Sequence, residues 1–180
     1  MAPWLLPTWK RECEMKVLDE SDRRHVEAAE GWLDLGVWEE GRNEIIAVTP
    51  EARTHPEVMR VFFELLTARG QWQAIADGAL ALCLAEPECV HGWFYRAMAL
   101  NRMDRTTEAR ETLLGVVEKF PGAFPIYYCL AACCCRLGDL KEARRWWRNA
   151  VAFSWNKDLE KIALEDPDLQ KLWKGGARQR

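Results

Sequence analysis

Apolar residues recur along most of the chain at spacings of three and four, and few stretches alternate apolar with polar residues. Spacings of three and four place side chains on one face of an α-helix, whereas strict alternation is typical of a strand. The pattern therefore predicts an all-α protein with essentially no sheet. The expected helices cover residues 22–35, 38–48, 56–69, 72–85, 90–103, 106–119, 124–137 and 140–153.

The predicted helices repeat in register. Gly36, Gly70, Asp104 and Gly138 are turn-forming residues, and each follows the previous one by thirty-four positions. Two columns in the same register hold mostly small residues, which let neighbouring helices approach closely: Ala29, Phe63, Ala97 and Ala131 in the first, and Gly41, Ile75, Ala109 and Ala143 in the second. A fixed period of this length is typical of stacked helix–turn–helix units. We therefore predict four helix hairpins, over residues 22–55, 56–89, 90–123 and 124–157.

Several of these positions resemble the tetratricopeptide repeat (TPR) family. Trp93 with Ala97, Ala109 and Pro121, and the run Leu-Gly-Asp-Leu-Lys-Glu-Ala at 137–143, are similar to its Trp-x-x-Leu-Gly-x-x-Tyr start, two later alanines and closing proline. The resemblance covers about residues 22–157, although bulky Phe63 and Ile75 depart from it. Segments 22–32 and 165–169 resemble the opening and closing segments of small bacterial TPR proteins of unassigned activity. The resemblance implies a right-handed α-solenoid of about four TPR hairpins with a free concave surface.

The two ends fall outside the repeats. Residues 1–21 are expected to be partly irregular, with a short helix within 9–18, and the apolar Trp4, Leu5 and Leu6 pack within the chain or against a neighbouring molecule. Asp166 followed by Pro167 is a typical helix start, because aspartate caps free amides and proline suits the first helical position. We therefore expect a capping helix within 158–174 and a frayed tail at 175–180.

Composition narrows the possible functions. The 180 residues carry a formal charge of −3 and are 49% hydrophobic. Domains that neutralise nucleic-acid phosphates are generally strongly basic, so we expect no nucleic-acid partner. No stretch approaches the roughly twenty apolar residues that cross a bilayer, and the start lacks a secretory pattern. We expect a cytoplasmic protein without a membrane partner, as a monomer or weak homo-oligomer.

Seven cysteines are the strongest chemical signal in the chain. Their number is odd and no paired spacing recurs, which argues against a disulfide framework. Cys129 and Cys133 share a helix face, yet a tetrahedral zinc site needs four ligands. We expect buried packing for most of them and exposure for Cys135; a metal or redox role on the fourth repeat is the alternative. On the next helix Trp147 is expected in the core and Arg144 on the surface.

No catalytic arrangement is visible in the sequence. The three histidines are scattered, and no phosphate-binding glycine loop or nucleophile elbow is present. We therefore expect a protein that is not an enzyme and needs no cofactor.

The resemblance also implies where a partner binds. In TPR proteins the first helix of each hairpin lines the concave groove, and its exposed columns carry over to Glu30, Arg60, Glu64, Phe94, Met98, Asn101, Arg102, Tyr128 and Arg136. The early part of this set is acid-rich, whereas the later part is aromatic and basic. This asymmetry favours an extended peptide with a basic part and an apolar or acidic end. The expected role is a non-catalytic protein–protein adaptor or scaffold, and self-association through the N-terminal apolar segment is the alternative.

Overall fold

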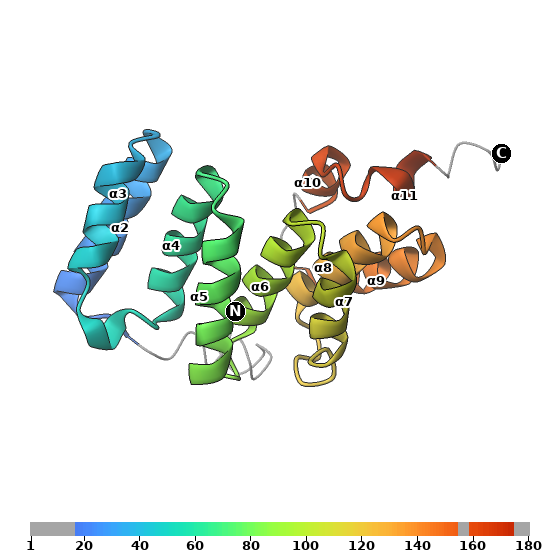
Figure 1. Ribbon diagram of the computed structural model, residues 1–180, viewed down its shortest axis with the longest axis horizontal. Coiled ribbons are helices and arrows are strands. Elements are labelled where there is room, and N and C mark those ends of the chain that lie inside the picture. Colours follow the sequence, from blue (N-terminus) through green and yellow to red (C-terminus); the bar gives the residue numbers. More distant parts are fainter. Residues whose placement is uncertain (1–16, 155–158, 175–180) are drawn as a thin grey trace. The chain divides into compact units, whose positions relative to one another are not determined.

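The computed structural model describes residues 17–154 and 159–174, and every regular element in these ranges is helical. The all-α prediction is confirmed. The expected short helix within residues 9–18 lies almost entirely outside the described part, as do Trp4, Leu5, Leu6 and the tail at 175–180. Helices pack as sequential antiparallel pairs (Figure 1). None of the helices that the structure describes has the length and apolar character needed to span a membrane.

The chain divides into two compact units, one up to Tyr95 and one from Arg96. From residue 17 on, the first unit holds four helices, a 3-10 turn and the first part of α6: α2 (Glu20–Asp34), α3 (Trp38–Ala47), η2 (Pro50–Ala52), α4 (Pro56–Ala68), α5 (Trp72–Ala85) and α6 (Val90–Arg102). Its core includes fully buried Val61, Phe63 and Ile75. Gly41 allows a close approach, because a Cβ there would lie 2.8 Å from Leu65 Cδ2.

The second unit begins within α6, and its described residues continue through five further helices: α7 (Thr106–Leu114), α8 (Phe124–Arg136), α9 (Leu140–Phe153), α10 (Leu159–Glu165) and α11 (Gln170–Lys174). Ala97, Ala131 and Ala143 are fully buried, as the small-residue columns predict. On α9 Trp146 is the more buried tryptophan and stacks on Tyr127 at 5.8 Å, whereas Trp147 is only half-buried. The expectation that Trp147 is the core residue of this pair is therefore wrong by one position.

The four turn residues that recur every thirty-four positions adopt the same backbone conformation. Gly36, Gly70, Asp104 and Gly138 have φ angles of 71°, 64°, 61° and 86°, all in the left-handed region. Each turn closes with a bond from the following residue's N–H to the carbonyl five residues earlier: Val37 to Trp32, Gln71 to Leu66, Arg105 to Leu100 and Asp139 to Cys134. This is the Schellman geometry that ends helices. The thirty-four-residue period of the sequence therefore marks the positions at which the first helix of each pair ends.

Two exposed glycines of the first unit are expected to respond to alanine in opposite directions. A Cβ would meet no atom within 4 Å at either Gly31, inside α2, or Gly36, at the turn. Gly31→Ala should stabilise by about 0.5–1 kcal/mol, because helical glycine is entropically costly. Gly36→Ala should destabilise by about 1–2 kcal/mol, because left-handed backbone strains a residue with a Cβ. Urea denaturation of both variants checks the signs; two shifts of equal sign would contradict the assignment.

Seven of the eight expected helices end within two residues of the observed bounds, but α7 is shorter. It ends at Leu114 rather than near residue 119, and Val116 N–H bonds the Leu113 carbonyl at 3.1 Å in a tighter turn. Gly115 disfavours helix, and the following turns bring Phe120 to full burial. Pro121 therefore does not end this helix.

The C-terminal cap also differs from expectation. Two short helices, α10 and α11, replace the single helix expected within 158–174. Pro167 lacks an amide donor and cannot continue α10. The Asp166 carboxylate does not cap a helix directly; it accepts the Asp168 N–H at 2.9 Å inside a turn. The chain between the two helices is therefore a compact turn rather than a helix start.

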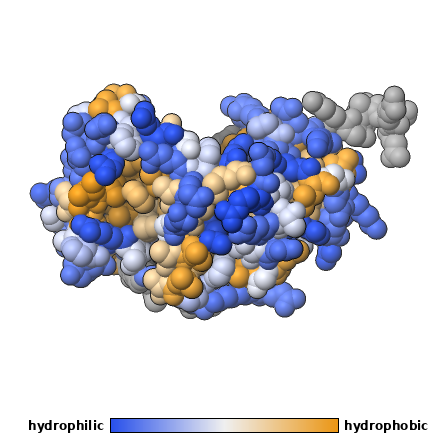
Figure 2. All heavy atoms as spheres, in the orientation of Figure 1, coloured by the Kyte–Doolittle hydropathy of each residue, from blue (hydrophilic) through white to orange (hydrophobic). Residues whose placement is uncertain are grey.

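Hydrophobic and hydrophilic side chains are interspersed on the face shown in Figure 2. Leu84 on α5 is 75% exposed and Leu164 on α10 is 58% exposed. Exposed apolar side chains are ordinary on folded proteins. They do not by themselves mark a binding site.

Candidate functional site

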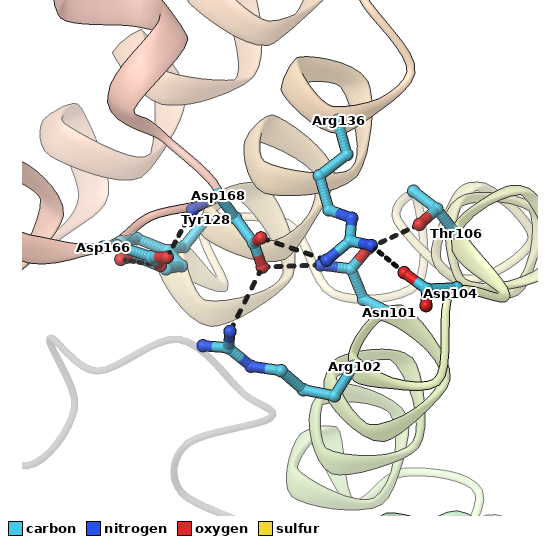
Figure 3. Close-up of polar contacts among 8 residues, drawn as sticks. All are labelled: Asn101, Arg102, Asp104, Thr106, Tyr128, Arg136, Asp166 and Asp168. Atoms are coloured by element: carbon cyan, nitrogen blue, oxygen red, sulfur yellow. Dashed lines mark hydrogen bonds and ion pairs between the residues drawn. The ribbon is translucent and has the colours of Figure 1, made fainter.

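The strongest candidate site lies in the second unit, where polar side chains from α6, α7 and α8 meet the turn between α10 and α11 (Figure 3). Asn101, in the last turn of α6, is only 5% exposed. Its Oδ1 accepts a hydrogen bond from Thr106 Oγ1 at 2.9 Å, and its Nδ2 donates to Asp168 Oδ2 at 2.9 Å. Thr106 begins α7, directly after the Asp104 turn. The Thr106 hydroxyl fixes the Asn101 side-chain amide so that Nδ2, the donor, faces Asp168.

Two arginines complete the surroundings of Asp168. Arg136 Nη1 donates to Asp168 Oδ1 at 3.2 Å, and Arg102 Nη1 lies 3.8 Å from Asp168 Oδ2. Arg136 Nη2 also pairs with the Asp104 carboxylate. The Asp168 side chain is 11% exposed, whereas those of Arg102 and Arg136 are 37% and 28% exposed. A largely buried carboxylate is thus held by one amide and two guanidinium groups that water still reaches.

The second carboxylate of the turn has a different partner. Tyr128 on α8 donates its hydroxyl proton to Asp166 Oδ2 at 2.7 Å. Burial, and then the hydrogen bond to Asp166, raise the pKa of Tyr128 above its ordinary value. The Tyr128 ring packs edge-on against Trp147 at 6.2 Å between centroids, and Trp147 packs edge-on against Trp173 at 5.4 Å. Tyr128 is therefore a neutral donor fixed by aromatic neighbours.

Donors dominate the helical side of this site. Arginine is effectively always charged, the asparagine amide does not titrate, and the tyrosine hydroxyl keeps its proton. None of these groups is suited to remove a proton from a substrate, because a general base needs a pKa near the working pH. The arrangement binds carboxylates.

The sequence-predicted site residues fall into separate groups. Asn101, Arg102, Tyr128 and Arg136 converge on the Asp166–Asp168 turn. Three of the predicted residues form a second group in the first unit, where Arg60 makes ion pairs with both Glu30 and Glu64. Phe94 is half-buried against Tyr95 at 5.0 Å, and Met98 is half-buried. That all nine residues form one groove stays a prediction.

Four site residues were not expected from the sequence: Asp104, Thr106, Asp166 and Asp168. Asp104 was identified only as a turn residue, and Asp166 only as a helix cap. A signal was present, because the acidic stretch at 165–168 complements the basic character of the predicted groove in the later repeats. What the sequence pattern does not show is that this stretch folds back onto Asn101 and Arg136.

The cysteines of α8 are buried, and the exposure predicted for Cys135 from its sequence position is wrong. Burial raises the pKa of Cys135, and the backbone of Leu172 and Lys171 in α11 partly offsets the rise, so α11 lies against this thiol. Burial raises the pKa of Cys133 to about 12 and that of Cys129 well above its usual value. Nucleophilic and metal-binding cysteines act as thiolates. Within residues 17–154 and 159–174, no three metal-ligating side chains of the His, Cys, Asp or Glu type group together.

A pocket of about 230 Å³ in the first unit is a weaker candidate. Its lining residues are mostly apolar: Ile45, Ile46, Arg53, Val58, Met59 and Phe62. The Arg53 guanidinium bonds the carbonyls of Val48 and Ile46 at 3.3 and 3.2 Å. Small-molecule sites usually add polar groups that orient the ligand. Because the charged lining residue already has backbone partners, the polar site of the second unit is preferred.

A scan against protein-family models finds no match to this chain, and a search of curated proteins finds none either. What the chain does is therefore inferred from its own contacts.

Proposed function

We propose that this chain is a non-catalytic protein–protein interaction module of the tetratricopeptide type. In this proposal the helix hairpins stack into a right-handed solenoid, and the partner is a protein or peptide. The left-handed turns at thirty-four-residue intervals and the buried small residues at Ala97 and Ala131 support it. A repeat of this period that buries small residues between antiparallel helices is typical of such modules.

The observation that carries the binding role is the convergence of four donor side chains on two carboxylates. Asn101, Arg102 and Arg136 face Asp168, while Tyr128 faces Asp166. Hydrogen bonds to a charged group are stronger than neutral ones, and arginine and tyrosine are frequent energetic anchors at interfaces. A partner segment that carries carboxylates fits these donors. For this half of the groove, the charge asymmetry of the sequence predicts an extended peptide with an apolar or acidic end.

The buried cysteines weaken the metal or redox alternative. Cys129 and Cys133 share a face of α8, but burial raises both pKa values. Forming either thiolate inside the unit is therefore costly.

Arg136→Ala is expected to weaken partner binding without unfolding the protein. Truncating an anchor at such a site commonly costs about 2 kcal/mol or more, which is roughly thirtyfold in affinity. The measurement compares the proteins that the purified chain and the variant retain from a native lysate, followed by Kd determination with the retained partner. Arg144→Ala is the matched control, since Arg144 is exposed on α9 and lies outside the site.

Both variants should keep the melting temperature within a few degrees, because Arg144 is exposed and because Asn101 and Arg102 still hold the Asp168 carboxylate when Arg136 is truncated. If Arg136→Ala and Arg144→Ala retain the same partners with equal affinity, the polar site of the second unit is not the binding surface and the proposed role is wrong.

A further inference from the structure

The geometry points to an internal competitor. We infer that the Asp166-Pro167-Asp168 turn occupies the site as a pseudo-ligand, and that the partner is an acidic segment with the same Asp-x-Asp spacing that displaces it. The inference rests on the proposed function and adds the chemistry of the partner and the regulation of the site.

The spacing follows from the way in which the two carboxylates are bound. Tyr128 binds only the first, at 2.7 Å, whereas Asn101 and Arg136 bind the second at 2.9 and 3.2 Å. Thr106 holds the Asn101 amide, and the aromatic contact with Trp147 holds the Tyr128 ring. Because both donors are fixed, a ligand must present two acceptors separated by one residue. A single carboxylate would leave one donor without its partner.

The shape of the turn is made within the segment itself. The Asp168 N–H donates to Asp166 Oδ1 at 2.9 Å, and the Leu169 N–H donates to the Asp166 carbonyl at 3.1 Å. An aspartate side chain that bonds the backbone two residues later is a local motif, independent of distant structure. Pro167 between the two carboxylates is exposed and donates no hydrogen bond. Another protein's Asp-Pro-Asp segment can therefore adopt the same form.

The Asp166-Pro167-Asp168 turn is attached in a way that favours its displacement by an outside ligand. α10 and α11 have seven and five residues, which is shorter than helices that are stable alone. Leu169 and Leu172 anchor the segment, with exposures of 0% and 6%, while the arginines on the other side remain solvated. Elements with few contacts open at lower cost than the rest of a domain. Since the competitor is tethered, its effective concentration is high and an outside ligand must compete with it.

The test uses the full chain and a labelled peptide with the sequence Ala-Leu-Glu-Asp-Pro-Asp-Leu-Gln of residues 163–170. Fluorescence anisotropy compares the wild type with the double variant Asp166→Asn and Asp168→Asn. The asparagines keep the volume and the local turn bond but remove both charges. Weakening a competitor raises the fraction of open sites, so the double variant should bind the peptide at least about tenfold more tightly.

Two controls isolate the site. Glu160→Gln with Glu165→Gln removes the same charge from exposed positions of α10 and should bind as the wild type does. Adding Arg136→Ala to the asparagine variant should abolish its gain in peptide affinity. A peptide with Asn-Pro-Asn in place of Asp-Pro-Asp should not bind. Equal affinity of the asparagine variant and the wild type, or a gain that survives Arg136→Ala, would overturn the inference.

Hydrogen exchange supplies a readout that does not depend on the variants. Saturating peptide should accelerate amide exchange over residues 159–174 of the wild type, since the segment is displaced. Binding with unchanged exchange there would show that the segment is a fixed cap. If competition fails while lysate partners still require Arg136, only this inference is wrong. If competition is observed but no partner depends on Arg136, the proposed function fails instead.

Discussion

Phe63→Ala is expected to lower the free energy of unfolding by about 3–5 kcal/mol, the usual cost of emptying a large buried aromatic site. Phe63 is fully buried in α4, with its ring 4.7 Å from Tyr95 and 6.0 Å from Phe62 between centroids. A Cβ on Gly78 would lie 3.3 Å from the same ring, so glycine there makes room for it. Removing the ring leaves a cavity between α4, α5 and the start of α6. Urea denaturation measures the loss.

The neighbouring Phe62 provides the matched control. It is half-buried and lines the open apolar pocket of the first unit, so its truncation leaves a site that water already reaches. Phe62→Ala should therefore cost clearly less than Phe63→Ala. Equal midpoints for the two variants would contradict the assignment of Phe63 to the core.

Ala131→Trp should destabilise the second unit by about 3 kcal/mol, at the upper end of the cost of overpacking. Ala131 is fully buried on α8, whose main partner is α9, and Ala97 on α6 is equally buried. An indole at either position forces the helices apart. Chemical denaturation of Ala131→Trp and Ala97→Trp measures the cost.

Lys141→Ala and Arg144→Ala are the surface controls for this experiment. Both side chains are exposed on α9, and changes at such positions usually stay within about 0.5 kcal/mol. Tryptophan variants with the midpoints of these controls would show that the small-residue columns do not lie between helices.

The helices were predictable because their stops are local. A left-handed turn at Gly36 or Gly138 requires a residue that tolerates positive φ, and this requirement is visible in the sequence. The end of α7 was less predictable. It depends on the burial of Phe120, a tertiary preference that overrides helical spacing. The choice between Trp146 and Trp147 failed for a similar reason, because tertiary packing decides which of the two is buried: Trp146 stacks on Tyr127, whereas Trp147 packs on Tyr128 and Trp173.

The candidate site was predictable on one side only. Asn101, Arg102, Tyr128 and Arg136 lie in the repeat columns that the TPR resemblance assigns to the groove, so the resemblance selects them. Asp168 is sixty-seven residues from Asn101 in sequence and lies outside the repeat, so no periodicity relates the two. The same segment buries Cys135, which the register had indicated as exposed. Periodicity thus predicts which side chains share a face but not which segment covers them.

The turn at Asp104 joins the repeat to the site. Asp104 is the non-glycine residue with positive φ among those described, and its carboxylate pairs with Arg136. Glycine would suit the backbone better at this position, as it does at the three equivalent turns. A change to glycine would make the four turns alike but would take a negative neighbour away from Arg136 and leave that guanidinium freer for an incoming acid. At this one position the regularity of the repeat and the proposed preference for an acidic ligand depend on the same residue and favour different side chains.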